Sequence, residues 1–202
     1  MKRSKAEAAQ THKRIVETAA KTFTRNGIRA TGVAEIMAAA GLTHGAFYRH
    51  FDSKEQLVAQ ACAASLASLV DSAGSVASEG NGTFLTRLEN FLASECHEHG
   101  LAGCPFVAMG SELARADPET RRAASVGFLE LVNLVASRES FEDVASAKGD
   151  AIFILTSMIG AVTMSRIVDD ASLSDQILTA AKERLAGVTE APRKRNPQRR
   201  AA

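Results

Sequence analysis

The 202-residue sequence has no tryptophan, one tyrosine and only three cysteines. The cysteines are odd in number and show no Cys-x-x-Cys spacing, so we expect no disulfide framework. The apolar stretches are broken every few residues by Gly, Ser, Thr or charge, so we expect no transmembrane span. The basic N-terminal stretch is not followed by an apolar signal-peptide core. The sequence therefore predicts a soluble, cytoplasmic protein with no membrane partner.

Charge is distributed unevenly along the chain. Residues 1–61 carry ten Lys/Arg against five Asp/Glu, whereas residues 62–186 carry nine against seventeen. Residues 187–202 carry five against one. A basic first third joined to an acidic body favours contact between the first third and a polyanion. Solvated faces of uneven charge would give the same pattern, so charge alone does not decide between these interpretations.

Helical spacing of apolar residues dominates, and no sustained two-residue alternation predicts a sheet. We therefore expect an all-α protein with three parts: a basic arm and three-helix unit over 1–52, a helical body over 53–187, and a basic disordered tail over 188–202. The expected helices, about nine in number, cover approximately residues 10–26, 31–41, 43–50, 53–78, 83–99, 105–115, 117–138, 148–168 and 172–187.

Residues that favour helix ends support these boundaries. Thr31 and Thr43 are suited to N-cap the second and third helices, and either Ser172 or Ser174 can start the last. Ser53 followed by Gln56 fits a capping box at the start of the long fourth helix. Pro105 is well placed as the first residue of the sixth helix.

The first third has the layout of a helix-turn-helix: a helix, a short helix, a tight turn and another short helix. Gly41 suits the turn because glycine tolerates positive φ. The predicted small core of this unit comprises Ile36, Met37, Leu42, Phe47 and Phe51.

The third helix carries the chain's only tyrosine on the face opposite this core. Phe47 and Phe51 are four residues apart and share one helix face. Tyr48 is therefore left to solvent, near Gly45, whose small size permits another molecule to come close. We interpret Tyr48 as an anchor for a DNA phosphate. The alternative is that its ring covers the edge of the core while its hydroxyl is merely solvated.

The segment TGVAEIMAAAGLTHGAFYRHFDSKEQLVAQA, residues 31–61, resembles the DNA-binding signature of the TetR family of transcriptional regulators. The resemblance extends over residues 11–62 and includes the threonine before the second helix, the Ala-Gly before the turn, and the Phe-Tyr and His-Phe pairs that follow. It implies a homodimer that binds a palindromic operator in double-stranded DNA, usually represses, and needs no cofactor.

The resemblance also implies which positions contact DNA. Phosphate contacts would come from Thr31, Thr43, Tyr48, His50 and Lys54, and base contacts from His44, Gly45, Ala46 and Arg49.

By the same resemblance, the body would bind a small-molecule inducer in a cavity between its helices. Few charged residues lie in the apolar stripes there, so we expect an apolar or weakly polar ligand. The alternative is that these aromatic and sulfur-containing side chains simply form the core. The candidate lining residues are Phe91, Cys104, Phe106, Met109, Phe128, Phe153 and Met158.

The stretch ECHEHGLAGCP, residues 95–105, holds four possible soft-metal ligands. Its spacing matches no common zinc pattern, and His97 and His99 would point in different directions from a helix, so we expect no metal site. Cys104 precedes a helix-starting proline, where the helix dipole lowers a thiol pKa. This arrangement resembles regulators that sense oxidants or electrophiles. Alternatively, Cys104 is a small buried apolar residue.

The last two long helices are the expected dimer interface. Gly160 and Ala161 would allow close approach of helices, with apolar area from Ile152, Leu155, Ile159 and Val162; burial in the chain's own core is the alternative.

Two other classes of function are alternatives to a DNA-binding regulator: an enzyme and a helical interaction protein. An enzyme would need Cys104 as nucleophile with His97 or His99 as base, but no orienting third group is evident, so we expect no enzyme. A helical interaction protein would leave the helix-turn-helix unexplained.

Overall fold

The computed structural model describes residues 5–76, 104–138 and 144–190, and within these ranges it contains helices and no strand. The predicted all-α class is confirmed. The expected helix over 83–99 and the tail lie outside the described residues. The helices are α1 Lys5–Asn26, α2 Val33–Ala39, the 3₁₀ helix η1 His44–Arg49, α3 Lys54–Val76, α5 Pro105–Leu113, α6 Pro118–Arg138, α7 Val144–Ile167 and α8 Ala171–Glu190.

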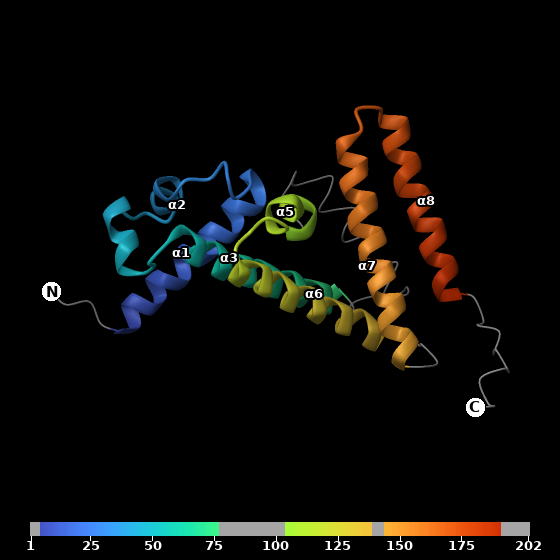
Figure 1. Ribbon diagram of the computed structural model, residues 1–202, viewed down its shortest axis with the longest axis horizontal. Helices are drawn as coiled ribbons and strands as arrows, with labels where there is room; N and C mark the ends of the chain where they lie inside the picture. The colour runs from blue at the N-terminus through green and yellow to red at the C-terminus, as the bar shows by residue number, and fades with distance from the viewer. Residues whose placement is uncertain (1–4, 77–103, 139–143, 191–202) are drawn as a thin grey trace.

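The helices form an elongated arrangement in which α1, α2 and η1 occupy one end and α7 and α8 the other (Figure 1). The long helices α3 and α6 pack side by side between the two ends (Figure 1). The short helix α5 lies between the N-terminal helices and α7, and contacts helices of both ends. Within the described residues, α5 is therefore one of the elements that join the two ends.

Two glycines with positive φ end the first two helices. Gly27, with φ +85°, follows α1, and its N–H donates to Phe23 O at 2.8 Å. Gly41, with φ +70°, follows the C-cap of α2. The N–H of Gly41 bonds Ala38 O at 2.9 Å and the N–H of Leu42 bonds Met37 O at 2.8 Å, which is a Schellman motif. The predicted tight turn at Gly41 is confirmed.

The helix starts differ in part from the sequence prediction. Gly32, not Thr31, is the N-cap of α2, because the Thr31 hydroxyl instead donates to Gly27 O at 2.7 Å. Thr43 does cap η1, but through its backbone position and without a side-chain hydrogen bond. The N–H of Ala46 bonds Thr43 O at 3.0 Å, an i to i+3 bond typical of a short 3₁₀ segment.

The capping box at α3 is present in shifted form. Ser53 Oγ accepts from the N–H of Gln56 at 3.1 Å, as predicted. The Gln56 side chain reaches back one residue further than the usual motif and accepts from the N–H of Asp52 at 2.8 Å. Both bonds use backbone donors that the helix itself leaves unpaired, so they fix the angle between η1 and α3.

Carboxylates cap the later helices. Asp117 Oδ1 accepts from the N–H groups of Glu119 and Thr120 at 2.9 and 3.0 Å, and Oδ2 accepts from the Thr120 hydroxyl at 2.6 Å. The bond from the Thr120 hydroxyl is the main cause of the lowered pKa of Asp117. At α8 the cap is Asp170, whose Oδ1 accepts from the N–H of Leu173 at 2.9 Å, so the prediction of a serine cap was wrong.

The apolar interior forms two clusters. The first joins α1, α2, η1 and α3, and confirms the predicted burial of Ile36, Met37, Phe47 and Phe51, with Leu42 partly buried against them. The second fills the space between α3, α6, α7 and α8. The first cluster includes Leu57, Val58, Ala61, Cys62 and Leu66 from α3 and Met109 and Leu113 from α5, so it continues beyond residue 52.

By length and composition alone, two of the described helical segments could cross a membrane: 54–75 and 147–167. The first packs against α1, α5 and α6, and the second against α5, α6 and α8. Both contribute buried residues to the clusters above. Each segment thus has one side packed within the fold.

Candidate nucleic-acid interface

The helix η1 separates a buried aromatic pair from an exposed tyrosine. Phe47 is 1% exposed, and its ring stacks on that of Phe51 with centroids 5.4 Å apart. Tyr48 is 69% exposed, and its ring meets that of Phe47 edge-on at 5.3 Å. The Tyr48 ring thus contacts the buried Phe47 while most of its surface stays exposed. This is the geometry that an anchor for an external partner requires.

The other predicted contact residues in and beside η1 are exposed or half-buried. Thr43, His44, Gly45 and Arg49 are exposed, and the His44 ring meets that of Tyr48 edge-on at 6.1 Å. Ala46 and His50 are half-buried at the edges of this surface. The surface therefore combines small residues, which permit close approach, with hydrogen-bond donors suited to phosphates and base edges. We call it the η1 face; it comprises Thr43, His44, Gly45, Ala46, Tyr48, Arg49 and His50.

The glycine within this face has no role in internal packing. A Cβ atom added to Gly45 would meet no atom within 4 Å, and its φ is not positive. Neither close packing nor backbone conformation within the described chain thus demands glycine here. An approaching molecule would account for it.

Two predicted phosphate contacts occupy internal positions. Thr31 is fully buried, so its side chain cannot reach DNA in this conformation. Lys54 directs its ammonium group inward, where Nζ donates to Ile28 O at 2.8 Å and to Thr31 O at 2.7 Å. These bonds hold the connection between α1 and α2. In this structure both side chains therefore make internal hydrogen bonds, and their predicted contacts with phosphates stay predictions.

His12 supports the η1 face and was not singled out from the sequence. Its ring stacks on Phe51 with centroids 4.5 Å apart, and its Nε2 lies 2.7 Å from Gln60 Oε1. It therefore ties α1 to the end of η1 and to α3. The sequence spacing could have indicated this packing, because His12 lies three and four residues before Ile15 and Val16 and so shares the apolar face of α1.

The candidate inducer-pocket residues divide into separate groups. Cys104 and Met158 are buried in the second cluster, where Phe106 and Phe128 meet edge-on with centroids 5.6 Å apart. Met109 instead belongs to the first cluster. Phe153 lies on the exposed side of α7, and Phe91 lies outside the described residues.

The part of the chain that the structure describes contains no group of three or more His, Cys, Asp or Glu side chains able to hold a metal ion. Three of the four residues weighed as metal ligands, Cys96, His97 and His99, lie outside that part.

Residues 15–61 match the sequence profile of the bacterial regulatory proteins of the tetR family. The N-terminal helices of the chain thus carry the sequence signature of TetR-family regulators. The chain is 42% identical over 58 residues to the HTH-type transcriptional regulator TtgR of Pseudomonas putida. The match covers 29% of the chain and spans only 28% of the length of TtgR. The family match over residues 15–61 includes η1 and parts of the helices that pack around it.

Solved structures show that the TetR-family likeness in fold extends over the body. The TetR-family regulator from Cytophaga hutchinsonii superposes with a TM-score of 0.71 at 19% identity, covering 95% of this chain and 100% of that one. The reduced form of Escherichia coli NemR superposes with a TM-score of 0.69 at 18% identity, covering 86% and 96%. At these identities the likeness is one of fold alone.

Proposed function

We propose that the protein is a cytoplasmic, DNA-binding transcriptional repressor rather than an enzyme. The observation that carries this proposal is the η1 face, in which an exposed tyrosine and small residues stand on a buried aromatic pair. The basic first third supplies the electrostatic attraction that binding to a phosphate backbone needs. In this function Tyr48, Thr43 and His50 contact phosphates, and His44, Gly45, Ala46 and Arg49 approach base edges.

The protein acts as a homodimer on a palindromic operator, because a single short η1 helix would make few contacts with DNA. Two copies of η1 set roughly 34–36 Å apart can enter successive major grooves of one DNA face. Support for a dimer comes from α7, which exposes an apolar stripe at helical spacing. We call it the α7 stripe; it comprises Phe153, Thr156, Gly160, Met164 and Ile167.

The α7 stripe differs from the interface expected from the sequence. Leu155 is buried in the chain's own second cluster, and Val162 is also buried within the chain, so neither is available to a partner. Ile152 is exposed beside the stripe. A Cβ added to Gly160 would meet nothing within 4 Å, which leaves room for close approach of a second helix. One face of α7 is therefore buried in the chain's own core, and we propose that the opposite, exposed face forms the dimer interface.

A small, mainly apolar inducer would release the DNA. The residues that support its site are those gathered around the Phe106–Phe128 ring pair, with Cys104 and Met158 in the same cluster. Their chemistry is apolar, in keeping with the expected ligand.

Cys104 supports a second candidate mode of sensing. It is the N-cap of α5, with Pro105 at the first helical position, so the dipole of the helix favours its thiolate. Covalent modification there would add bulk next to Phe106. NemR, which shares the fold, was solved in a form described as reduced.

The deciding experiment is selection of duplex DNA from a random-sequence library, followed by affinity measurements on the enriched sequence. We expect an inverted repeat, and an affinity that falls steeply between about 50 and 200 mM salt because phosphate contacts release counterions. In the His44→Ala variant the preferred bases should change. Absence of any enriched sequence, or affinity independent of salt, would contradict the proposal.

A further inference from the structure

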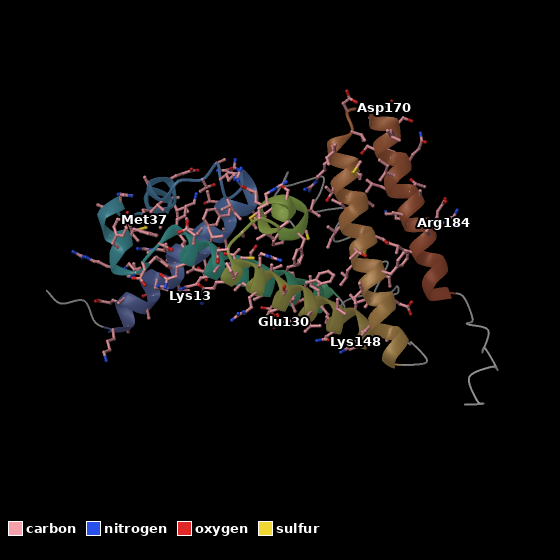
Figure 2. All side chains as sticks on the ribbon, viewed as in Figure 1. Lys13, Met37, Glu130, Lys148, Asp170 and Arg184 are labelled. Atoms are coloured by element: carbon pink, nitrogen blue, oxygen red, sulfur yellow. The ribbon has the colours of Figure 1, made fainter. Side chains whose placement is uncertain are left out.

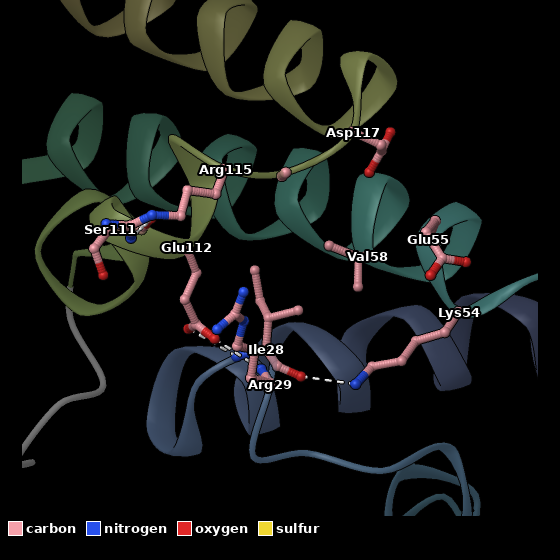
Figure 3. Close-up of a pocket in the computed structure, with 10 residues that line it drawn as sticks. Ile28, Arg29, Lys54, Glu55, Val58, Ser111, Glu112, Arg115 and Asp117 are labelled. Atoms are coloured by element: carbon pink, nitrogen blue, oxygen red, sulfur yellow. Dashed lines mark hydrogen bonds between the residues drawn. The ribbon is translucent and has the colours of Figure 1, made fainter.

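The carboxylate of Glu112, on α5, binds the connection between α1 and α2. Its Oε2 accepts from the N–H of Ile28 at 3.0 Å and its Oε1 from the N–H of Arg29 at 2.7 Å (Figure 3). Hydrogen bonds to an ionised acceptor are roughly twice as strong as neutral ones. Gly27 leaves room for this contact, since a Cβ there would lie 3.0 Å from Glu112 Oε2.

The same connection is held from its other side by a cation. Lys54 of α3 donates to Ile28 O and Thr31 O, as Figure 3 shows for the first of these bonds. Two charged side chains of opposite sign, from two different helices, thus hold the N–H and C=O groups of one short segment. Its position therefore depends on where α5 lies relative to α3.

The helix α5 is placed to transmit displacements because it contacts both apolar clusters. At its start, Cys104 belongs to the second cluster and Phe106 faces Phe128. Further along, Met109 and Leu113 are buried in the first cluster. Apolar contacts are not directional and tolerate small shifts of a helix, whereas the paired hydrogen bonds of Glu112 have a fixed geometry.

The connection leads directly into α2, and α2 passes through the Gly41 turn into η1. Both helices pack in the first cluster, so they move together with the connection. We propose that Glu112 is a coupling residue, which converts a displacement of α5 caused in the second cluster into a displacement of the η1 face. This proposal rests on the proposed DNA-binding function and adds to it the residue through which the body acts.

The surroundings of Glu112 provide a matched control. The carboxylate lies in the wall of a pocket of ≈ 430 Å³ that is also lined by Glu55 and Arg115 (Figure 3). Arg115 donates to Ser111 O at 2.8 Å within its own turn of chain. Glu55→Gln therefore removes one carboxylate charge from the same pocket without touching the hydrogen bonds to the connection.

The first measurement is amide hydrogen exchange in the full-length protein without DNA. Glu112→Gln keeps the shape of the side chain but removes its charge and one acceptor oxygen. We expect exchange at Ile28 and Arg29 to speed up about tenfold or more, in line with loss of a charge-assisted bond. Glu55→Gln should leave these two amides unchanged. Equal exchange in Glu112→Gln and the parent would overturn the proposal.

The second measurement is a double-mutant cycle with affinity for the selected DNA as its readout. Phe128→Leu disturbs the ring pair at the start of α5 from within the second cluster, and we expect it to change DNA affinity at least severalfold in the parent but little in the Glu112→Gln background. If Phe128→Leu does not fold, Phe106→Leu disturbs the same ring pair. The coupling would be overturned if the two substitutions changed DNA affinity independently, so that their fold-changes multiply in the double variant. It would also be overturned if a ring variant folded and bound DNA with the affinity of the parent.

The two measurements also separate this proposal from the proposed function. A parent protein that enriches no DNA refutes DNA binding, whereas the exchange rates still report whether Glu112 holds the connection. A parent that binds DNA, together with independent effects of the two substitutions, refutes the coupling alone.

Discussion

Gly127 of α6 lies directly against Leu66 of α3: a Cβ added to Gly127 would lie 2.6 Å from Leu66 Cβ. No pair of side-chain carbons can approach so closely without displacement, so glycine is what permits α3 and α6 to pack at this distance. Because these helices run side by side between the two ends of the molecule, their spacing determines how the ends are joined (Figure 2).

We expect Gly127→Ala to destabilise the fold. Overpacking costs about 1–3 kcal/mol, which outweighs the gain in helix propensity of at most about 1 kcal/mol. The midpoint of thermal unfolding should fall by about 2–4 °C for each kcal/mol lost. Gly110→Ala is the control, since a Cβ there meets nothing within 4 Å and its midpoint should not fall. A Gly127→Ala variant as stable as the parent would show that α3 and α6 separate freely.

Tyr48→Phe should weaken DNA binding without changing stability. The ring contact with Phe47 remains, and the substitution removes a hydroxyl from a side chain that is largely exposed. The lost hydroxyl–phosphate bond is worth about 1–3 kcal/mol because its partner is charged. The loss measured by fluorescence anisotropy should be similar on the selected and on unrelated DNA. If affinity matches the parent on both, Tyr48 is not a phosphate anchor.

Met164→Glu should convert the dimer to a folded monomer. Met164 is 47% exposed, so the isolated chain tolerates a charge there, whereas a dimer would have to bury it. Light scattering should report the monomer mass, and circular dichroism an unchanged helix content. The comparison variant is Leu129→Glu, on the exposed side of α6. Loss of the dimer in Leu129→Glu and not in Met164→Glu would move the interface away from the α7 stripe.

Cys104 should react with iodoacetamide faster than Cys62 near neutral pH. Burial raises the pKa of the Cys62 thiol to about 11, so almost none of it is thiolate. Cys104 is buried as well, but it lies at the start of a helix, where the helix dipole favours an anion. Mass spectrometry after limited alkylation ranks the thiols, including Cys96. Slower reaction of Cys104 than Cys62, or an unchanged response to electrophiles in Cys104→Ser, would reject the sensing role.

The raised pKa of Cys62 also predicts a dependence of stability on alkaline pH. Between the ordinary value of 9.0 and about 11, the unfolded chain loses the Cys62 proton while the folded chain keeps it. The contribution of this thiol to stability is therefore complete below 9.0 and is lost as pH rises through about 11. Urea unfolding should show that the advantage of the parent over Cys62→Ala shrinks across this range. A constant difference would mean that Cys62 is not desolvated.

The sequence was sufficient for the N-terminal fold because each of its signals is local. The positive φ of Gly41, the Ser53–Gln56 cap and the burial of Phe47 against Phe51 all depend on residues within a few positions of each other. The all-α class followed for the same reason. The exposure of Tyr48 was also predictable, since it lies on the face opposite the two phenylalanines.

The roles of the other residues depend on contacts between segments far apart in the sequence, and the spacing of apolar residues does not predict such contacts. Lys54 has the composition of a phosphate-binding residue, but its ammonium group bonds carbonyls more than twenty residues earlier. Glu112 gave no signal at all, because its partners are backbone N–H groups of Ile28 and Arg29. Phe153 has the residue type of a pocket lining, yet it lies on the exposed side of α7.

The first apolar cluster has a consequence for engineering hybrid regulators. Cutting the chain after residue 52 and joining it to another helical body would remove the α3 and α5 residues of this cluster, among them Leu57, Met109 and Leu113, and would leave the apolar surface beneath α1 uncovered. The Ile28 and Arg29 amides would also lose the carboxylate that accepts their hydrogen bonds. A transferable DNA-binding unit must therefore include the first half of α3 and the whole of α5. Otherwise it can be joined only to bodies whose equivalent helices present the same apolar side chains and a carboxylate in the place of Glu112.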